Sequence, residues 1–160
     1  MVAALNDAPV LRHIGIVVSD LEKAERIFVE LFGFEIKVNY PKLRGDYLSS
    51  LLGLEQVEAR IAILKMPDNN RIELLEYRSP TSPRLAPPRA NDVGLSHFAI
   101  RVEDLNEIYR RSADYDICFV NSPMDSPDGS VKVAYAVLME EAIVELVQVC
   151  NEKACYSGGK

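Results

Sequence analysis

The chain of 160 residues lacks several features that would each assign it to a class of protein. No apolar run approaches the length of a membrane-spanning helix, so we expect no membrane partner. The first ten residues lack the basic start and long apolar stretch of a signal peptide, and we therefore expect a cytoplasmic location. The net charge of −6 leaves no basic excess, which argues against binding to nucleic acid.

Cysteine is also scarce, and its spacing excludes a cysteine-based metal site. The three residues are Cys118, Cys150 and Cys155, an odd number that is best read as free thiols in a reducing compartment. We expect Cys118 and Cys150 in the core because they lie in apolar runs. We expect Cys155 in a mobile tail.

What is present is typical of one soluble globular domain. The chain is 48% hydrophobic and 26% charged, and its length suits a single core. In the first half, residues 11–18, 34–40, 58–66 and 71–77 read as strands, and residues 21–32 read as a helix that ends at Gly33. Residues 41–54 read as a connection with a short helical turn.

The second half repeats this order. We expect strands at 94–102, 117–120, 131–139 and 142–149, a helix at 105–112, and a loop at 122–130. The segment 79–92 contains four prolines and reads as a linker. The expected division of the 1–160 domain is therefore module 1 at about 11–78, a linker at about 79–92, module 2 at about 93–150 and a frayed tail at 151–160.

Two modules of the order βαβββ favour an α+β fold. One module alone would bury only one face of its sheet. We predict that the two modules pair into a half-open, metal-binding β-barrel with the helices outside.

The two histidines of the chain begin the same phrase. His13 and His97 each open the pattern H-x-x-I-x-V-x-D-L, and they lie 84 residues apart. The last strand of each module adds a second matched pair, because Glu73 and Glu145 both lie between apolar residues. A carboxylate buried in a strand is costly unless it meets a cation or strong donors. Glu76, three positions after Glu73, faces the opposite side, and we assign it to the surface.

Each of these four residues also has an ordinary interpretation. A single histidine at the start of a strand is more often a packing residue than a ligand, and a glutamate between apolar residues often faces solvent. The coincidence of both types at repeat-equivalent positions favours one divalent ion bound by two histidines and two glutamates. Mixed nitrogen and oxygen ligands suit Zn, Co, Ni, Mn or Fe(II).

With these residues the chain resembles the vicinal oxygen chelate superfamily, which includes glyoxalases, bleomycin resistance proteins and extradiol dioxygenases. The matching segments are residues 12–34, 71–83, 94–108 and 143–148. Within that superfamily the chain is similar to methylmalonyl-CoA epimerases. The resemblance implies a metal held by His13, Glu73, His97 and Glu145, and it implies a homodimer.

The activity implied by the resemblance is that of a metal-dependent epimerase or isomerase. It would remove and return a proton next to a carbonyl through a metal-stabilised enolate, with Glu73 and Glu145 as catalytic carboxylates. The small-molecule substrate carries a carbonyl. It is either a CoA ester or a sugar-like or cyclitol ketone, because residues 126–142 depart from the epimerase pattern.

Other functions remain as alternatives. A glyoxalase I-like lactoylglutathione lyase falls behind because the chain has no tryptophan for the Asn-Trp-Gly segment of those enzymes. A metal-free antibiotic-binding resistance protein does not need the four ligands, and an extradiol dioxygenase does not need Glu73.

Five further side chains lie on strands that could line the cavity, namely Arg60, Lys65, Arg101, Lys132 and Tyr135. The linker run 84–89 could touch a substrate, and Tyr47 could belong to a lid. Pairing of the modules within one chain and across two chains both fit the repeat.

Overall fold

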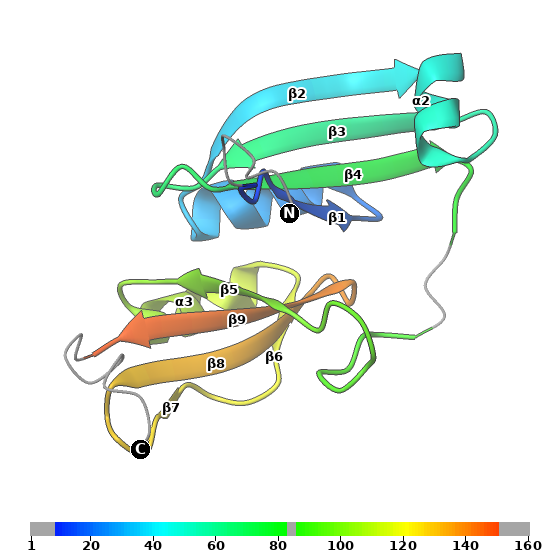
Figure 1. Ribbon diagram of the computed structural model, residues 1–160. Coiled ribbons are helices and arrows are strands. Elements are labelled where there is room, and N and C mark those ends of the chain that lie inside the picture. Colours follow the sequence, from blue (N-terminus) through cyan, green and yellow to red (C-terminus); the bar gives the residue numbers. More distant parts are fainter. Residues whose placement is uncertain (1–8, 83–85, 151–160) are drawn as a thin grey trace, which may run out of the picture.

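Each half of the sequence forms its own sheet with the same strand arrangement (Figure 1). The structure, a computed structural model, describes residues 9–82 and 86–150. The first sheet has the order β1-β4-β3-β2, and the second has the order β5-β9-β8-β6, with β7 paired to β8. The strands are β1 (Ile14–Val17), β2 (Glu35–Arg44), β3 (Glu58–Lys65), β4 (Arg71–Ser79), β5 (Phe98–Arg101), β6 (Ile117–Phe119), β7 (Met124–Asp125), β8 (Val131–Leu138) and β9 (Ala142–Val149). The expected α+β fold with two paired βαβββ units is confirmed, and the two sheets stay open rather than closing into a barrel.

A helix follows the first strand of each sheet, and the repeated Asp-Leu dipeptide explains where it begins. The Asp20 side chain accepts a hydrogen bond from the Lys23 N–H, and Asp104 accepts one from the Glu107 N–H in the same way. Such capping satisfies a backbone donor that the first helical turn leaves unpaired. The helices are α1 (Leu21–Arg26), its π-helical continuation η1 (Ile27–Leu31), α2 (Asp46–Leu52), α3 (Leu105–Arg111) and η2 (Ser112–Asp114).

One hydrophobic core joins the helix-covered faces of both sheets. In the first sheet Ile16, Ile72 and Leu74 point into it, and in the second sheet Val144 and Leu146 do the same. Because side chains alternate along a strand, the neighbours of these residues point to the opposite face. That opposite face is open, and it carries the positions of His13, Glu73, His97 and Glu145.

Polar contacts hold the two halves together on the helix side. Lys23 Nζ lies 3.9 Å from Asp116 Oδ2, and the Arg111 guanidinium donates to the Glu30 carbonyl oxygen at 2.9 Å. The Ser19 N–H donates to Glu141 Oε1 at 2.8 Å. Each contact joins a residue of the first half to one of the second. The two halves therefore have a defined relative position.

The segment that begins at Pro41 is partly a strand and not the expected connection. β2 continues to Arg44, with a register shift against β3 between Tyr40 and Leu43. β2 is the edge strand of its sheet, where a proline is tolerated because only one side of the strand must supply ladder hydrogen bonds. The short helical turn expected within 41–54 is confirmed as α2.

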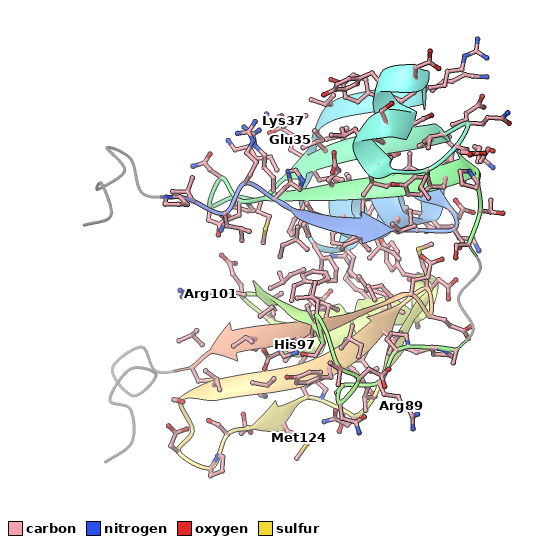
Figure 2. The ribbon with its side chains drawn as sticks, turned by 45° about the vertical axis from the view of Figure 1, so that its right-hand side comes forward. Glu35, Lys37, Arg89, His97, Arg101 and Met124 are labelled. Carbon is pink, nitrogen blue, oxygen red and sulfur yellow. The ribbon has the colours of Figure 1, made fainter. Side chains whose placement is uncertain are left out.

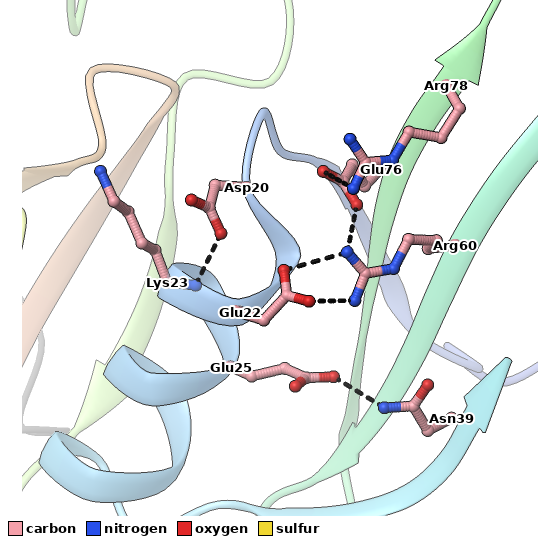
Figure 3. Close-up of polar contacts among 8 residues, drawn as sticks. All are labelled: Asp20, Glu22, Lys23, Glu25, Asn39, Arg60, Glu76 and Arg78. Carbon is pink, nitrogen blue, oxygen red and sulfur yellow. Dashed lines mark hydrogen bonds and ion pairs between the residues drawn. The ribbon is translucent and has the colours of Figure 1, made fainter. Parts of the chain in front are cut away.

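Glu76 is buried rather than at the surface, which corrects the sequence-based assignment. It does face opposite to Glu73, but α1 covers that face and leaves Glu76 only 4% exposed. Figure 3 shows how its charge is balanced: Arg60 Nη1 lies 3.0 Å from Glu76 Oε2, and Arg78 Nη2 lies 3.2 Å from Glu76 Oε1. Arg60 also pairs with Glu22 of α1, and this hydrogen bond raises the pKa of Arg60.

The expectation for the cysteines is also wrong where the structure describes them. Cys118 and Cys150 are both exposed free thiols. Cys118 lies on β6, a short strand at the end of its sheet, so an apolar run there does not imply burial. Cys155 and the tail 151–160 lie outside the described residues, as do residues 83–85 at the start of the linker run. Among the described helices, none has the length and apolar character needed to cross a membrane.

Candidate metal centre

His13 and Glu73 form the first of two matching pairs on the open faces of the sheets. Glu73 lies on β4, opposite Gly15 of the parallel strand β1, and His13 directly precedes β1. His13 Nε2 lies 3.3 Å from Glu73 Oε2, with the two side chains 38% and 22% exposed. We call these two residues the first pair.

His97 and Glu145 form the second pair at the repeat-equivalent place. His97 directly precedes β5 (Figure 2). Glu145 lies on β9 opposite Ala99. His97 Nε2 lies 3.4 Å from Glu145 Oε2. Ser96 Oγ lies 2.8 Å from the other ring nitrogen, Nδ1, and the Tyr135 hydroxyl lies 3.4 Å from Nε2. A hydroxyl on the ring nitrogen that does not bind the cation, as Ser96 is on Nδ1, fixes the orientation of a ligating imidazole.

The spacing within each pair fits two ligands of one cation. Ligand atoms that each lie about 2.1 Å from a metal, at roughly tetrahedral angles, are about 3.4 Å apart. In both pairs the closest contact joins an imidazole nitrogen to a carboxylate oxygen, and these are the donors that borderline divalent metals accept. The structure thus brings the four predicted residues together two by two. Within residues 9–82 and 86–150, no three His, Cys, Asp or Glu side chains gather closely enough to hold a metal.

A cleft of about 300 Å³ borders the second pair at His97. One wall is β1, including Gly15, the cross-strand neighbour of Glu73, and another wall includes His97. The remaining lining comes from the chain before His97, including Arg89 and Leu95, and from residues 141–143. The cleft therefore offers a small molecule a place beside His97 and against β1 of the first sheet.

The other side chains that the sequence suggested for the cavity do not all lie near the two pairs. Tyr135 contacts the second pair, with its ring centroid 5.1 Å from that of His97. Arg60 does not line the open face, because it lies on the helix side with Glu22 and Glu76.

The remaining candidates lie elsewhere. Arg101, at the far end of β5 from His97, borders a separate cavity of about 830 Å³ with Met66 and Glu103. Lys132 lies 3.8 Å from Asp125, and Tyr47 is an exposed residue of α2.

Ser96 was not among the sequence candidates. A serine beside a histidine is not informative in one sequence, and only the orientation of the ring shows that Ser96 contacts Nδ1.

Comparison with known proteins identifies the family of the chain. Residues 12–135 match the family model described as the glyoxalase/bleomycin resistance protein/dioxygenase superfamily. A curated relative from Actinomyces sp, named 2-epi-5-epi-valiolone epimerase, is 33% identical over 101 residues, which are 62% of this chain and 55% of the relative. The matched region thus spans about half the length of that relative.

Solved structures agree on the fold. A glyoxalase family protein from Bacillus cereus superposes with a TM-score of 0.80 at 24% identity, covering 91% of this chain and 99% of that one. The trypanothione-dependent glyoxalase I of Leishmania major gives a TM-score of 0.61 at 20% identity, covering 92% and 89%. Because the family model matches most of the chain, this protein belongs to the glyoxalase/bleomycin resistance protein/dioxygenase superfamily.

Proposed function

We propose that this protein is a metal-dependent epimerase that removes and returns a proton on a carbon next to a carbonyl. The observation that supports this most is the pair of His–Glu contacts at repeat-equivalent positions, one on each sheet. A fold requirement alone does not explain why an imidazole and a carboxylate meet twice on faces open to solvent. The curated relative, itself named an epimerase, supports the same class of reaction.

The proposed ligands are His13, Glu73, His97 and Glu145. A divalent cation bound there would supply Lewis-acid stabilisation of the negative charge that develops on the carbonyl oxygen. Each pair would supply two of the four ligands. Zn, Co, Ni, Mn and Fe(II) all suit this donor set.

The two carboxylates perform the proton chemistry. One carboxylate accepts the proton as the C–H bond breaks, and the electron pair moves into the enolate of the substrate. Return of a proton to the opposite face re-forms the C–H bond with inverted configuration. No oxidant or reductant is needed. Glu73 and Glu145 come from different sheets at repeat-equivalent positions, and in the proposed site they would meet opposite faces of the carbon.

We propose a cyclitol ketone as the substrate class in preference to a CoA ester. The relative's name specifies a valiolone, and the sequence at 126–142 departs from CoA-ester epimerases. The cleft of about 300 Å³ suits a single ring. It has polar groups to meet hydroxyls, including Arg89 and Ser96.

The test is a substrate panel with metal-loaded protein. Protein stripped with a chelator is reloaded with each of the five metals and incubated with 2-epi-5-epi-valiolone, methylmalonyl-CoA and the hemithioacetal of methylglyoxal. We expect metal-dependent epimerisation of the first, seen by NMR. Turnover of the CoA ester or the hemithioacetal instead would replace the substrate class. Tight binding of a ligand without any metal requirement would support a resistance-type binding protein.

Three further expectations belong to this proposal. The division into modules at about 11–78 and 93–150 would appear as protease-resistant halves separated by cleavage in the linker. A homodimer would appear as twice the chain mass in sedimentation equilibrium. A cytoplasmic location would be checked by fractionation of the source cells.

A further inference from the structure

A cavity of about 830 Å³ lies away from the two His–Glu pairs and borders both halves of the chain. The first half contributes the end of η1 and the turn between β3 and β4, and the second half contributes the ends of β5 and β9 and the start of α3. Arg101 marks its position in Figure 2, at the opposite end of β5 from His97. Neither pair contributes a side chain to this lining, although all four of their residues belong to the described part of the chain.

The part of the cavity that meets the core is apolar. Phe34 and Ile100, which are 4% and 2% exposed, line it together with the partly buried Phe32, Met66 and Val102. Protein interiors are normally close-packed, so apolar side chains beside an open volume of this size forgo packing contacts. Such a volume, at the junction of two units and lined largely by apolar and aromatic side chains, is typical of a small-molecule pocket.

The wall from the first half is built on an unusual helix. Residues 27–31 form η1, a π-helix, in which the Phe32 N–H donates to the Ile27 carbonyl oxygen at 3.3 Å. This acceptor is one residue further back than in an α-helix. Segments of π-helix are rare and occur frequently at functional sites. The second half has a 3₁₀ turn, η2, after its own helix α3, so the repeat does not require the wide turn.

The charged side chains that line the cavity are mostly acidic. We call these four carboxylates, which come from both halves, the rim: Asp68, Glu103, Asp104 and Glu107. Arg101 is the one cation among the described lining residues, and it has an interaction partner of its own. Glu107 pairs with Arg110. Asp68 and Glu103, one from each half, pair with no cation within residues 9–82 and 86–150. The rim therefore carries negative charge that a ligand can neutralise.

We infer that this cavity binds a small organic cation, a molecule with an apolar or aromatic body and a protonated amine or quaternary ammonium group. The body displaces water from Phe32, Phe34 and Val102, and burial of apolar surface favours binding. The positive group stays at the rim, where Asp68 and Glu103 attract it. Aromatic rings attract cations as well. An anion of the same shape is disfavoured because it meets carboxylates at the rim.

Three probes of one shape test the preference for a cation. They are 4-phenylbutylamine, 4-phenylbutanol and 4-phenylbutyrate, each titrated into the ¹⁵N-labelled full chain and followed by NMR. The amine should bind about 5-fold or more tightly than the alcohol, and the butyrate should bind more weakly than either. The amides that shift should be those of residues 31–34, 66–68 and 100–104. Equal binding of amine and alcohol would overturn the choice of a cation, and shifts centred on His97 or α2 would overturn the location.

A double variant of the rim tests the role of its unpaired charges. In Asp68→Asn/Glu103→Gln the affinity for the amine should fall about 3- to 10-fold, while the affinity for the alcohol should stay within about twofold. The control Glu55→Gln/Asp125→Asn removes the same net charge at exposed positions away from the cavity and should change neither affinity. No loss in the rim variant, or an equal loss in the control, would contradict the role of these two carboxylates.

Filling the apolar part of the cavity tests the location independently. Val102→Phe should abolish binding of the amine and of the alcohol, with circular dichroism as the check that the chain is folded. Val120→Phe, at a position that is 68% exposed beyond β6, is the matched control and should bind both probes as the wild type does. Amine binding that survives in folded Val102→Phe would overturn the cavity as the site. If this variant does not fold, the map of shifted amides in the wild type decides the location. None of these measurements uses a metal or the proposed substrate, so their outcome is independent of the proposed function.

Discussion

Replacing Arg60 with methionine removes the main counter-charge of a buried carboxylate. Glu76 is 4% exposed, and without Arg60 its remaining partner is Arg78, whose side chain is 54% exposed. Breaking a buried ion pair by deleting one partner costs about 3 to 5 kcal/mol. Because Arg78 remains, we expect Arg60→Met to cost about 3 kcal/mol, at the lower end of this range. For a chain of this size that lowers the Tm by about 6 to 12 °C.

Urea and thermal denaturation followed by circular dichroism measure this cost. The control is Lys37→Met, which removes an exposed ion pair with Glu35 and should change stability little. The double variant Arg60→Met/Glu76→Leu should recover much of the loss, since an apolar pair of similar volume replaces the buried charge without leaving it unpaired. A cost below about 1 kcal/mol for Arg60→Met, or no recovery in the double variant, would refute the reasoning.

Three other predictions concern metal, pH and packing. A saturating divalent metal at 100 times its Kd should stabilise the fold by about 2.7 kcal/mol, seen as a higher Tm that His13→Ala and His97→Ala abolish. Hydrogen bonds from the Ser126 hydroxyl, and then from Ser130, lower the pKa of Asp128 to about 2 from 3.8. Because the pKa of Asp128 is lower in the folded state, its stabilisation of the fold is complete above about pH 4 and is lost as the pH falls through about 2. In urea titrations, the free energy of unfolding of Asp128→Asn should therefore fall less steeply than that of the wild type across this pH window. Phe28→Ala, at a fully buried core position, should cost about 3 to 5 kcal/mol by the same assay.

The order of helices and strands was predictable because alternation and 3.6-residue spacing are local properties of the sequence. The same rules place Glu73 and Glu76 on opposite faces of β4. They do not reveal which face a helix covers. Glu73 was expected to be buried and Glu76 exposed, whereas the Glu73 side chain is 22% exposed and that of Glu76 is 5% exposed.

The candidate site was predictable to the extent that the repeat preserves it. His13 with Glu73, and His97 with Glu145, meet as their matched positions suggest. The residues that lie across the sheet from each glutamate were not predictable from the sequence. Ile63 lies opposite Glu73 and Tyr135 lies opposite Glu145, and this follows only from the register of β3 with β4 and of β8 with β9.

The measurement that tests the central claim most directly is solvent deuterium incorporation by the metal-loaded protein, with a cyclitol ketone as substrate in D₂O. We predict that deuterium enters at the carbon next to the carbonyl, that a chelator stops it, and that restoring the metal restarts it. Epimerisation without deuterium incorporation, or with the same rate after complete removal of metal, would contradict the account.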